Sequence, residues 1–190
     1  MTRQEALDYD NELKSRLALE AEILGLEEST GSSIVDNYIM VIPDDARKGM
    51  VFLGNEAVSY KFGNISMDFK KALAAGIELL ASVSCPESFF NYVQLLITGA
   101  LFIRKAARQE IGKNEAYIVY YLHIRNGYET GIEEESFIND FSNWYKEKNR
   151  NVPDPAEIRI AIENLSHWKI IAIDGGKIWL KETVMGVMEP

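Results

Sequence analysis

The chain has 190 residues, of which 47% are apolar and 26% are charged; this composition excludes a disordered chain and is typical of a globular protein. Lysine and arginine residues number 20 and aspartate and glutamate residues number 29, so the formal net charge is -9. This balance argues against a general nucleic-acid binder, which needs a clustered basic surface to neutralise phosphates.

The start of the chain and its cysteine content indicate a compartment. Residues 1–8 are polar and acidic and lack the basic and apolar regions of a signal peptide. Cys85 is the only cysteine, so no disulfide can form within the chain. We therefore expect a cytoplasmic protein. Residues 88–103 form a run of sixteen uncharged residues, shorter than the ~18 expected of a spanning helix, so we expect a buried helix and no membrane association.

The N-terminal region predicts one amphipathic helix followed by strands. Apolar residues recur at three- and four-residue steps over residues 2–24, which predicts a helix there. Residues 27–33 are polar and rich in serine and glycine, which indicates a break in regular structure. Three short runs rich in β-branched and aromatic residues, separated by turn-like segments, then predict a small antiparallel β-meander: residues 38–42, 50–53 and 57–62.

Two apolar helices are predicted next, and a break after them marks a domain boundary. Ser66 suits the N-cap of a helix over residues 67–83, and Pro86 suits the first position of a helix that ends near residue 111. Gly112, Lys113 and Asn114 then interrupt the pattern. We therefore predict a helical domain with a small β-meander over residues 1–112 and a second domain over residues 113–190.

Three helices are predicted in the second domain. Asn114 suits the N-cap of a helix that runs through Arg125, and the acids at 133–135 suit the positive end of the next helix dipole. Asp154 and Pro155 form the clearest helix start in the chain, because aspartate caps exposed amides and proline presets φ. Each of the last two helices carries an apolar stripe: Phe137, Ile138, Phe141, Trp144 and Tyr145 on one, and Ile158, Ala161, Ile162, Leu165 and Trp168 on the other.

A β-hairpin over residues 169–181 is predicted after the third helix. Gly175 and Gly176 can both adopt positive φ, which a two-residue type I′ turn requires. This turn sets a register in which four pairs of residues face each other: Asp174 with Lys177, Ile173 with Ile178, Ala172 with Trp179, and Ile171 with Leu180.

Three helices followed by a two-stranded wing make residues 114–184 resemble the winged-helix superfamily. The resemblance is carried by residues 158–165, by His167-Trp168-Lys169 and by the hairpin sequence IAIDGGKIWL. It leaves residues 1–112 unexplained. Together with the elements predicted there, it gives an α+β, mostly helical fold class, with N-terminal helices and a small antiparallel β-meander before a C-terminal winged helix. Members of this family commonly insert the third helix into a DNA major groove, whereas others bind proteins.

The face of the third helix opposite its apolar stripe is the candidate partner-binding surface. Its residues are Arg159, Ile160, Glu163 and His167, with Asn164 to one side. Arg159 and Asn164 suit guanine and adenine edges. Glu163, however, would repel phosphate, and Ile160 places an apolar side chain at the centre of the face.

The wing carries the best candidates for phosphate contacts, which are Lys169, Lys177 and Lys181. Solvated lysines that protect an edge strand from aggregation are the more ordinary interpretation. Residues 113–190 hold nine basic and 13 acidic side chains, so the predicted second domain lacks a basic field. Net charge therefore disfavours DNA as the partner.

Catalytic and cofactor-binding motifs are absent from the sequence. It contains no phosphate-binding loop, dinucleotide-binding loop or nucleophile elbow. Neither His123 nor His167 has a histidine or cysteine at metal-ligand spacing. Asp44 and Asp45 suit a solvated turn. Cys85 suits a small apolar position at a helix junction, and a thiol activated beside His123 is the alternative. We expect no enzymatic activity, no cofactor and no metal.

Three functions from different classes remain open. The first is an interaction module, a subunit or adaptor in a larger protein assembly. The second is a DNA-binding transcriptional regulator whose N-terminal domain senses a ligand or forms a dimer. The third is an acidic inhibitor of a basic toxin or nuclease, similar to an immunity protein or antitoxin, which only the net charge supports. The acidity, the helix face centred on Ile160 and the lack of catalytic motifs favour the first, and a homo-oligomer is compatible with it.

Overall fold

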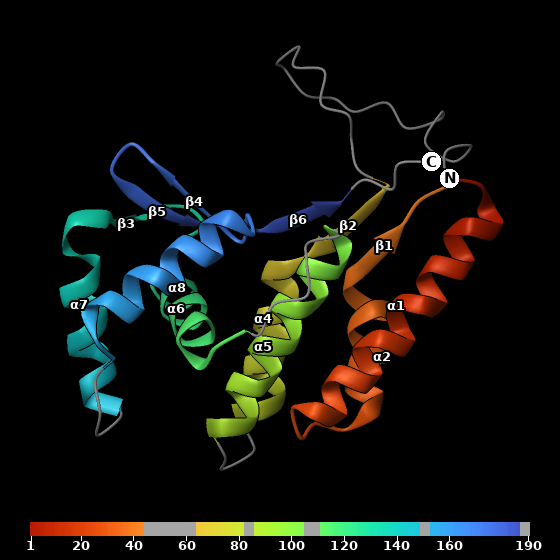
Figure 1. Ribbon diagram of the computed structural model, residues 1–190, viewed down its shortest axis with the longest axis horizontal. Helices are drawn as coiled ribbons and strands as arrows, with labels where there is room; N and C mark the ends of the chain where they lie inside the picture. Colours follow the sequence, from red (N-terminus) through yellow and green to blue (C-terminus); the bar gives the residue numbers. More distant parts are fainter. Residues whose placement is uncertain (44–63, 82–85, 105–110, 149–152, 187–190) are drawn as a thin grey trace.

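The computed structural model describes residues 1–43, 64–81, 86–104, 111–148 and 153–186 (Figure 1). Within these residues it contains seven helices and two three-stranded antiparallel sheets, which confirms an α+β fold that is mostly helical. The helices follow one another across Figure 1, from α1 and α2 at one end to α7 at the other, and the sheets lie along one side of them. No described helix has both the length and the apolar character needed to cross a membrane.

Helix α1 (Arg3–Ile23) confirms the first predicted helix and begins with a reciprocal cap. The Thr2 hydroxyl accepts a hydrogen bond from the Glu5 amide at 3.2 Å, and the Glu5 carboxylate accepts one from the Thr2 amide at 2.7 Å. Both bonds satisfy amides that a helix start would otherwise leave unpaired. The apolar stripe of α1 is buried through Leu13, Leu17 and Ala21.

Helix α2 (Glu28–Tyr38) shows that the predicted break over residues 27–33 is wrong. The Ser- and Gly-rich composition serves helix packing here. Gly31 is buried, and its Cα faces the α1 backbone at Leu17 and Ala18 so closely that a Cβ would collide with it. Close packing of two helices against each other therefore outweighs the weak helix propensity of this segment.

The first sheet joins β1 (Ile39–Val41), β2 (Ile65–Asp68) and β6 (Thr183–Gly186) in the order β1-β2-β6. Strand β1 confirms the first strand of the predicted meander, although Tyr38 belongs to α2. The other two predicted strands, residues 50–53 and 57–62, lie outside the described residues. Strand β1 pairs with β2, and the sheet takes its third strand, β6, from the far end of the chain.

Ser66 is not a helix cap, because Ser66 and Met67 belong to β2. Helix α4 (Phe69–Ala81) starts two residues later than predicted, where the Asp68 carboxylate accepts a hydrogen bond from the Lys71 amide at 3.1 Å. Aspartate at this position satisfies a free amide of the first turn, as a serine cap would. The alternation of apolar and polar residues over 65–68 is that of a strand: Ile65 and Met67 face the core, and β2 pairs with β1 and β6.

Helix α5 (Pro86–Ile103) is the apolar centre of the N-terminal half, and it starts at Pro86 as predicted. The helix ends at Ile103, before the predicted end near residue 111. The helix is buried on several sides through Tyr92, Val93, Leu95, Leu96, Ile97, Ala100, Leu101 and Ile103. It packs against α1 and α4 on one side and against α6 (Lys113–Ile124) on the other.

The three helices of the second half are α6, α7 (Glu134–Lys148) and α8 (Pro155–His167), close to their predicted positions. Gly112, and not Asn114, is the N-cap residue of α6. The Asp154 carboxylate caps α8 by accepting a hydrogen bond from the Ala156 amide at 2.7 Å, as predicted. The predicted stripes face the core: every residue of the α8 stripe is buried, and in α7 Phe137, Phe141 and Trp144 are buried while Ile138 and Tyr145 pack against the core.

Strands β4 (Ile171–Asp174) and β5 (Lys177–Leu180) form the predicted hairpin in the predicted register, with all four pairs confirmed. Gly175 and Gly176 have φ values of 57° and 73°, as a type I′ turn requires. An unpredicted third strand, β3 (Ile132–Glu133), pairs with β5 and gives the order β3-β5-β4. With two residues, β3 is too short for alternation to predict it.

The two halves of the chain contact each other through rings and through β6. Phe90 of α5 packs on Tyr117 of α6 with ring centroids 3.7 Å apart, and Phe89 packs on Tyr120 at 4.9 Å. Strand β6 belongs to the predicted second domain but pairs with β2 of the first. The division at residue 112 stays a prediction.

A polar network lies beside this junction. Lys70 of α4 forms an ion pair with Glu182 at 2.7 Å and lies 4.9 Å from the centre of the Tyr128 ring. The Tyr128 hydroxyl is hydrogen-bonded to Nδ1 of His123 at 2.7 Å. Burial, and secondarily the charge of Lys70, lower the pKa of His123 below its usual value.

The close approach at Gly31 predicts that Gly31→Ala destabilises the protein by roughly 1–3 kcal/mol, the usual cost of overpacking. At an open helical position the same change would stabilise by about 0.5–1 kcal/mol. Chemical denaturation measures the difference, with Ser32→Ala in the same helix as the control, expected within about 0.5 kcal/mol of the wild type. A Gly31→Ala variant more stable than the wild type would contradict this packing.

The lowered pKa of His123 predicts a loss of stability in mild acid. The folded state binds a proton at this site less readily than the unfolded state, so the contribution is complete above about pH 6.5 and is lost as the pH falls through the folded pKa. Between pH 7.5 and pH 5.5, the free energy of unfolding should fall less for His123→Gln than for the wild type. His167→Gln, at an exposed position, should retain the loss seen in the wild type.

Candidate docking surface

The outer face of α8, which we define as Arg159, Ile160, Glu163 and His167, is exposed along its length. Ile160 at its centre is 57% exposed. The opposite face of the same helix is buried against the core, so α8 cannot turn this isoleucine inward without exposing its own stripe. The structure thus brings four of the five predicted third-helix residues together on one open surface.

Asn164, the fifth of these residues, faces α6. Its amide donates a hydrogen bond to the Glu115 carboxylate at 2.9 Å. Glu115 is only 6% exposed, so this bond supplies a donor to a carboxylate that is largely removed from water. Asn164 therefore joins α8 to α6 and does not belong to the outer face.

The three wing lysines have different surroundings. Lys177 pairs with Glu133 at 3.4 Å and donates a hydrogen bond to the Thr130 carbonyl at 3.2 Å, which ties β5 to the segment before β3. Lys169 is exposed and has a φ of 60° where α8 ends. Lys181 is also exposed. Of the three wing lysines, Lys169 and Lys181 are therefore the two whose side chains are exposed and take part in none of the hydrogen bonds or ion pairs described.

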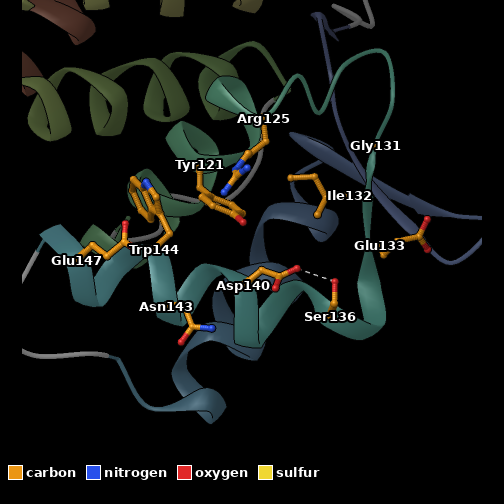
Figure 2. Close-up of a pocket in the computed structure, with 10 residues that line it drawn as sticks. All are labelled: Tyr121, Arg125, Gly131, Ile132, Glu133, Ser136, Asp140, Asn143, Trp144 and Glu147. Carbon is orange, nitrogen blue, oxygen red and sulfur yellow. Dashed lines mark hydrogen bonds between the residues drawn. The ribbon is translucent and has the colours of Figure 1, made fainter.

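A concave site, which we call the α6–α7 groove, was not predicted from the sequence. It has a volume of about 550 Å³ and lies between the end of α6, the start of β3 and one face of α7 (Figure 2). Its lining residues are Tyr121, Arg125, Gly131, Ile132, Glu133, Ser136, Asp140, Asn143, Trp144 and Glu147. The sequence did hold one signal for it, because four of the α7 residues recur at helical spacing as a polar stripe: Ser136, Asp140, Asn143 and Glu147.

The groove combines aromatic rings with mostly acidic side chains. The Arg125 guanidinium lies 5.5 Å from the centre of the Tyr121 ring, and burial raises the pKa of the Tyr121 hydroxyl, which keeps it neutral. The Asp140 carboxylate accepts a hydrogen bond from the Ser136 hydroxyl at 2.7 Å, drawn as a dashed line in Figure 2. Three carboxylates, those of Glu133, Asp140 and Glu147, line the groove together with one guanidinium, and Figure 2 shows that of Glu133 turned away from Asp140.

The residues singled out for catalysis or metal binding are not brought together in the described part of the chain. The ring of His123 is engaged by Tyr128, and Cys85, Asp44 and Asp45 lie outside the described residues. Among residues that the structure describes, no three histidine, cysteine or carboxylate side chains are grouped as metal ligands are.

Comparison with known proteins finds no family model, no curated protein and no solved structure that matches the chain. The winged-helix resemblance of the second half stays a prediction.

The inward bond of Asn164 predicts a stability effect rather than a binding effect. Asn164→Ala removes the donor to a buried carboxylate and should lower the free energy of unfolding by roughly 1–3 kcal/mol. Glu163→Ala, one position away on the outer face, should change it by less than about 0.5 kcal/mol. Denaturant unfolding of both variants makes the comparison, and equal effects would show that the Asn164–Glu115 bond adds no stability.

Proposed function

We propose that the protein is a non-enzymatic, cytoplasmic winged-helix interaction module, a subunit or adaptor whose α8 outer face docks a protein partner. The observation that carries this proposal is the 57% exposed Ile160 at the centre of a charged helix face. An apolar anchor ringed by polar side chains is typical of the centre of a protein interface.

The element order supports the winged-helix part of the proposal. Three helices, α6 to α8, precede the β4–β5 hairpin, and β3 joins that hairpin from the connection between the first two. The same order supports DNA binding through α8 as the alternative function. The charges favour a protein, because Glu163 shares the outer face with Arg159, and Lys177 is already paired with Glu133.

The proposal predicts that Ile160→Glu abolishes partner binding without unfolding the protein. Burying the new carboxylate in an interface should cost more than ~2 kcal/mol of binding, whereas the exposed position should change stability by less than about 0.5 kcal/mol. Capture from the native host with the purified wild-type chain as bait, followed by titration of the recovered partner, measures the loss.

Leu19→Glu on α1 is the matched control, because Leu19 is 54% exposed on another helix. It should retain the partner. Random duplex DNA at low salt tests the alternative, with Arg159→Gln, Lys169→Gln and Lys181→Gln combined to remove the exposed cations of α8 and the wing. Two results together would favour a DNA-binding regulator over the proposal. The wild type would bind duplex DNA strongly and the triple variant would not, and Ile160→Glu would leave partner binding unchanged.

A further inference from the structure

We propose that the α6–α7 groove binds a basic side chain, arginine or lysine, of a partner protein. This inference rests on the proposed function in one respect, that the partner is a protein. It adds a second contact site and the chemistry of the partner segment that fits it. Three properties of the groove carry the proposal: its charge, its apolar lining and its size (Figure 2).

Two carboxylates of the groove, those of Asp140 and Glu147, are available to a ligand. Arg125 lies over the Tyr121 ring, and Glu133 pairs with Lys177. Asp140 accepts a hydrogen bond from Ser136, which does not neutralise it. Across the described ranges, neither Asp140 nor Glu147 lies within ion-pair distance of a lysine or arginine. A cation that entered the groove would be attracted by both carboxylates and would gain a charge-assisted contact with at least one of them.

Apolar side chains line the same space. Tyr121 and Trp144 contribute aromatic rings, and Ile132 contributes an aliphatic side chain from β3. Lysine and arginine place a long aliphatic stem on such surfaces while their charged group reaches a carboxylate. Their cations are also attracted to aromatic rings, as Arg125 is to Tyr121 within this groove. The end of α6 adds the negative end of a helix dipole.

The size and charge of the groove indicate which kind of molecule supplies this cation. Its volume of about 550 Å³ is within the range of roughly 300–1,000 Å³ that ligand sites have, and leaves room for a side chain with adjoining backbone. Anions are disfavoured because carboxylates outnumber the single guanidinium. The chain as a whole has a net charge of -9, which attracts a basic protein segment over a long range. We therefore assign the site to a basic segment of the partner.

Titration of the full-length chain with synthetic peptides tests this assignment directly. The probe is a short peptide of alternating arginine and glycine, and its counterpart contains glutamate in place of arginine. Binding is followed by NMR at the Trp144 indole and the Asn143 side-chain amide, both in the groove. We expect saturable shifts at these two groups with the arginine peptide, weaker binding at higher salt and no binding of the glutamate peptide.

Two double variants that change the net charge equally distinguish binding in the groove from non-specific attraction by the acidic chain. Asp140→Asn with Glu147→Gln should weaken binding of the arginine peptide at least tenfold, and both changes preserve shape. Glu22→Gln with Glu28→Gln alters exposed positions on α1 and α2 and should leave the affinity within twofold of the wild type. Thermal unfolding of each variant checks that the fold is retained.

Three results would overturn the assignment: no binding of the arginine peptide to the wild type, equal weakening by both double variants, or shifts confined to residues outside the groove. These results are distinguishable from failure of the proposed function, because the peptide titration requires no native partner. If the wild type binds the peptide in the groove but Ile160→Glu still binds the recovered partner, the α8 docking face is wrong and the groove assignment stands.

Discussion

The packing of α6 against its neighbours is the constraint from which the positions of both candidate surfaces follow. Ala116, Ile118, Val119 and Leu122 of this helix are completely buried, since α5 lies on one side and α8 on another. Tyr121 packs edge-on against two rings of α7. A helix buried on so many sides has no freedom to slide, because every shift would open a cavity. Apolar contacts between α5 and α6 therefore hold the two halves of the chain together.

Strand β6 and the polar network strengthen the same junction in different ways. The pairing of β6 with β2 carries the chain from the hairpin back to the N-terminal sheet, so the hairpin cannot move far from it. Lys70 and Glu182 form their ion pair beside this strand, and Tyr128 and His123 continue the contacts into α6. Exposed ion pairs contribute little by themselves, whereas the lowered pKa of the half-buried His123 favours its neutral form at the junction.

The candidate surfaces differ in chemistry because they use different faces of the helices. The α8 outer face is convex and has an isoleucine at its centre, which suits an apolar contact. The α6–α7 groove is concave and acidic, which suits a cation. Asn164 belongs to neither surface, since Glu115 holds it between α8 and α6. A partner that used both surfaces would present an apolar patch and a basic segment.

The sequence by itself determined the features that depend on neighbouring residues. The Gly175–Gly176 turn sets the hairpin register, Asp154 and Pro155 start α8, and the apolar stripes of α7 and α8 point to the core, because turn, cap and helical periodicity are local. Only the tertiary structure decided that residues 28–38 are helical, since the reason is a close contact with α1. It likewise decided the pairings of β2, β3 and β6, the inward bond of Asn164 and the α6–α7 groove. The pairings and the Asn164 bond join groups far apart in the chain, and the groove depends on how α6, β3 and α7 pack together, which no local pattern encodes.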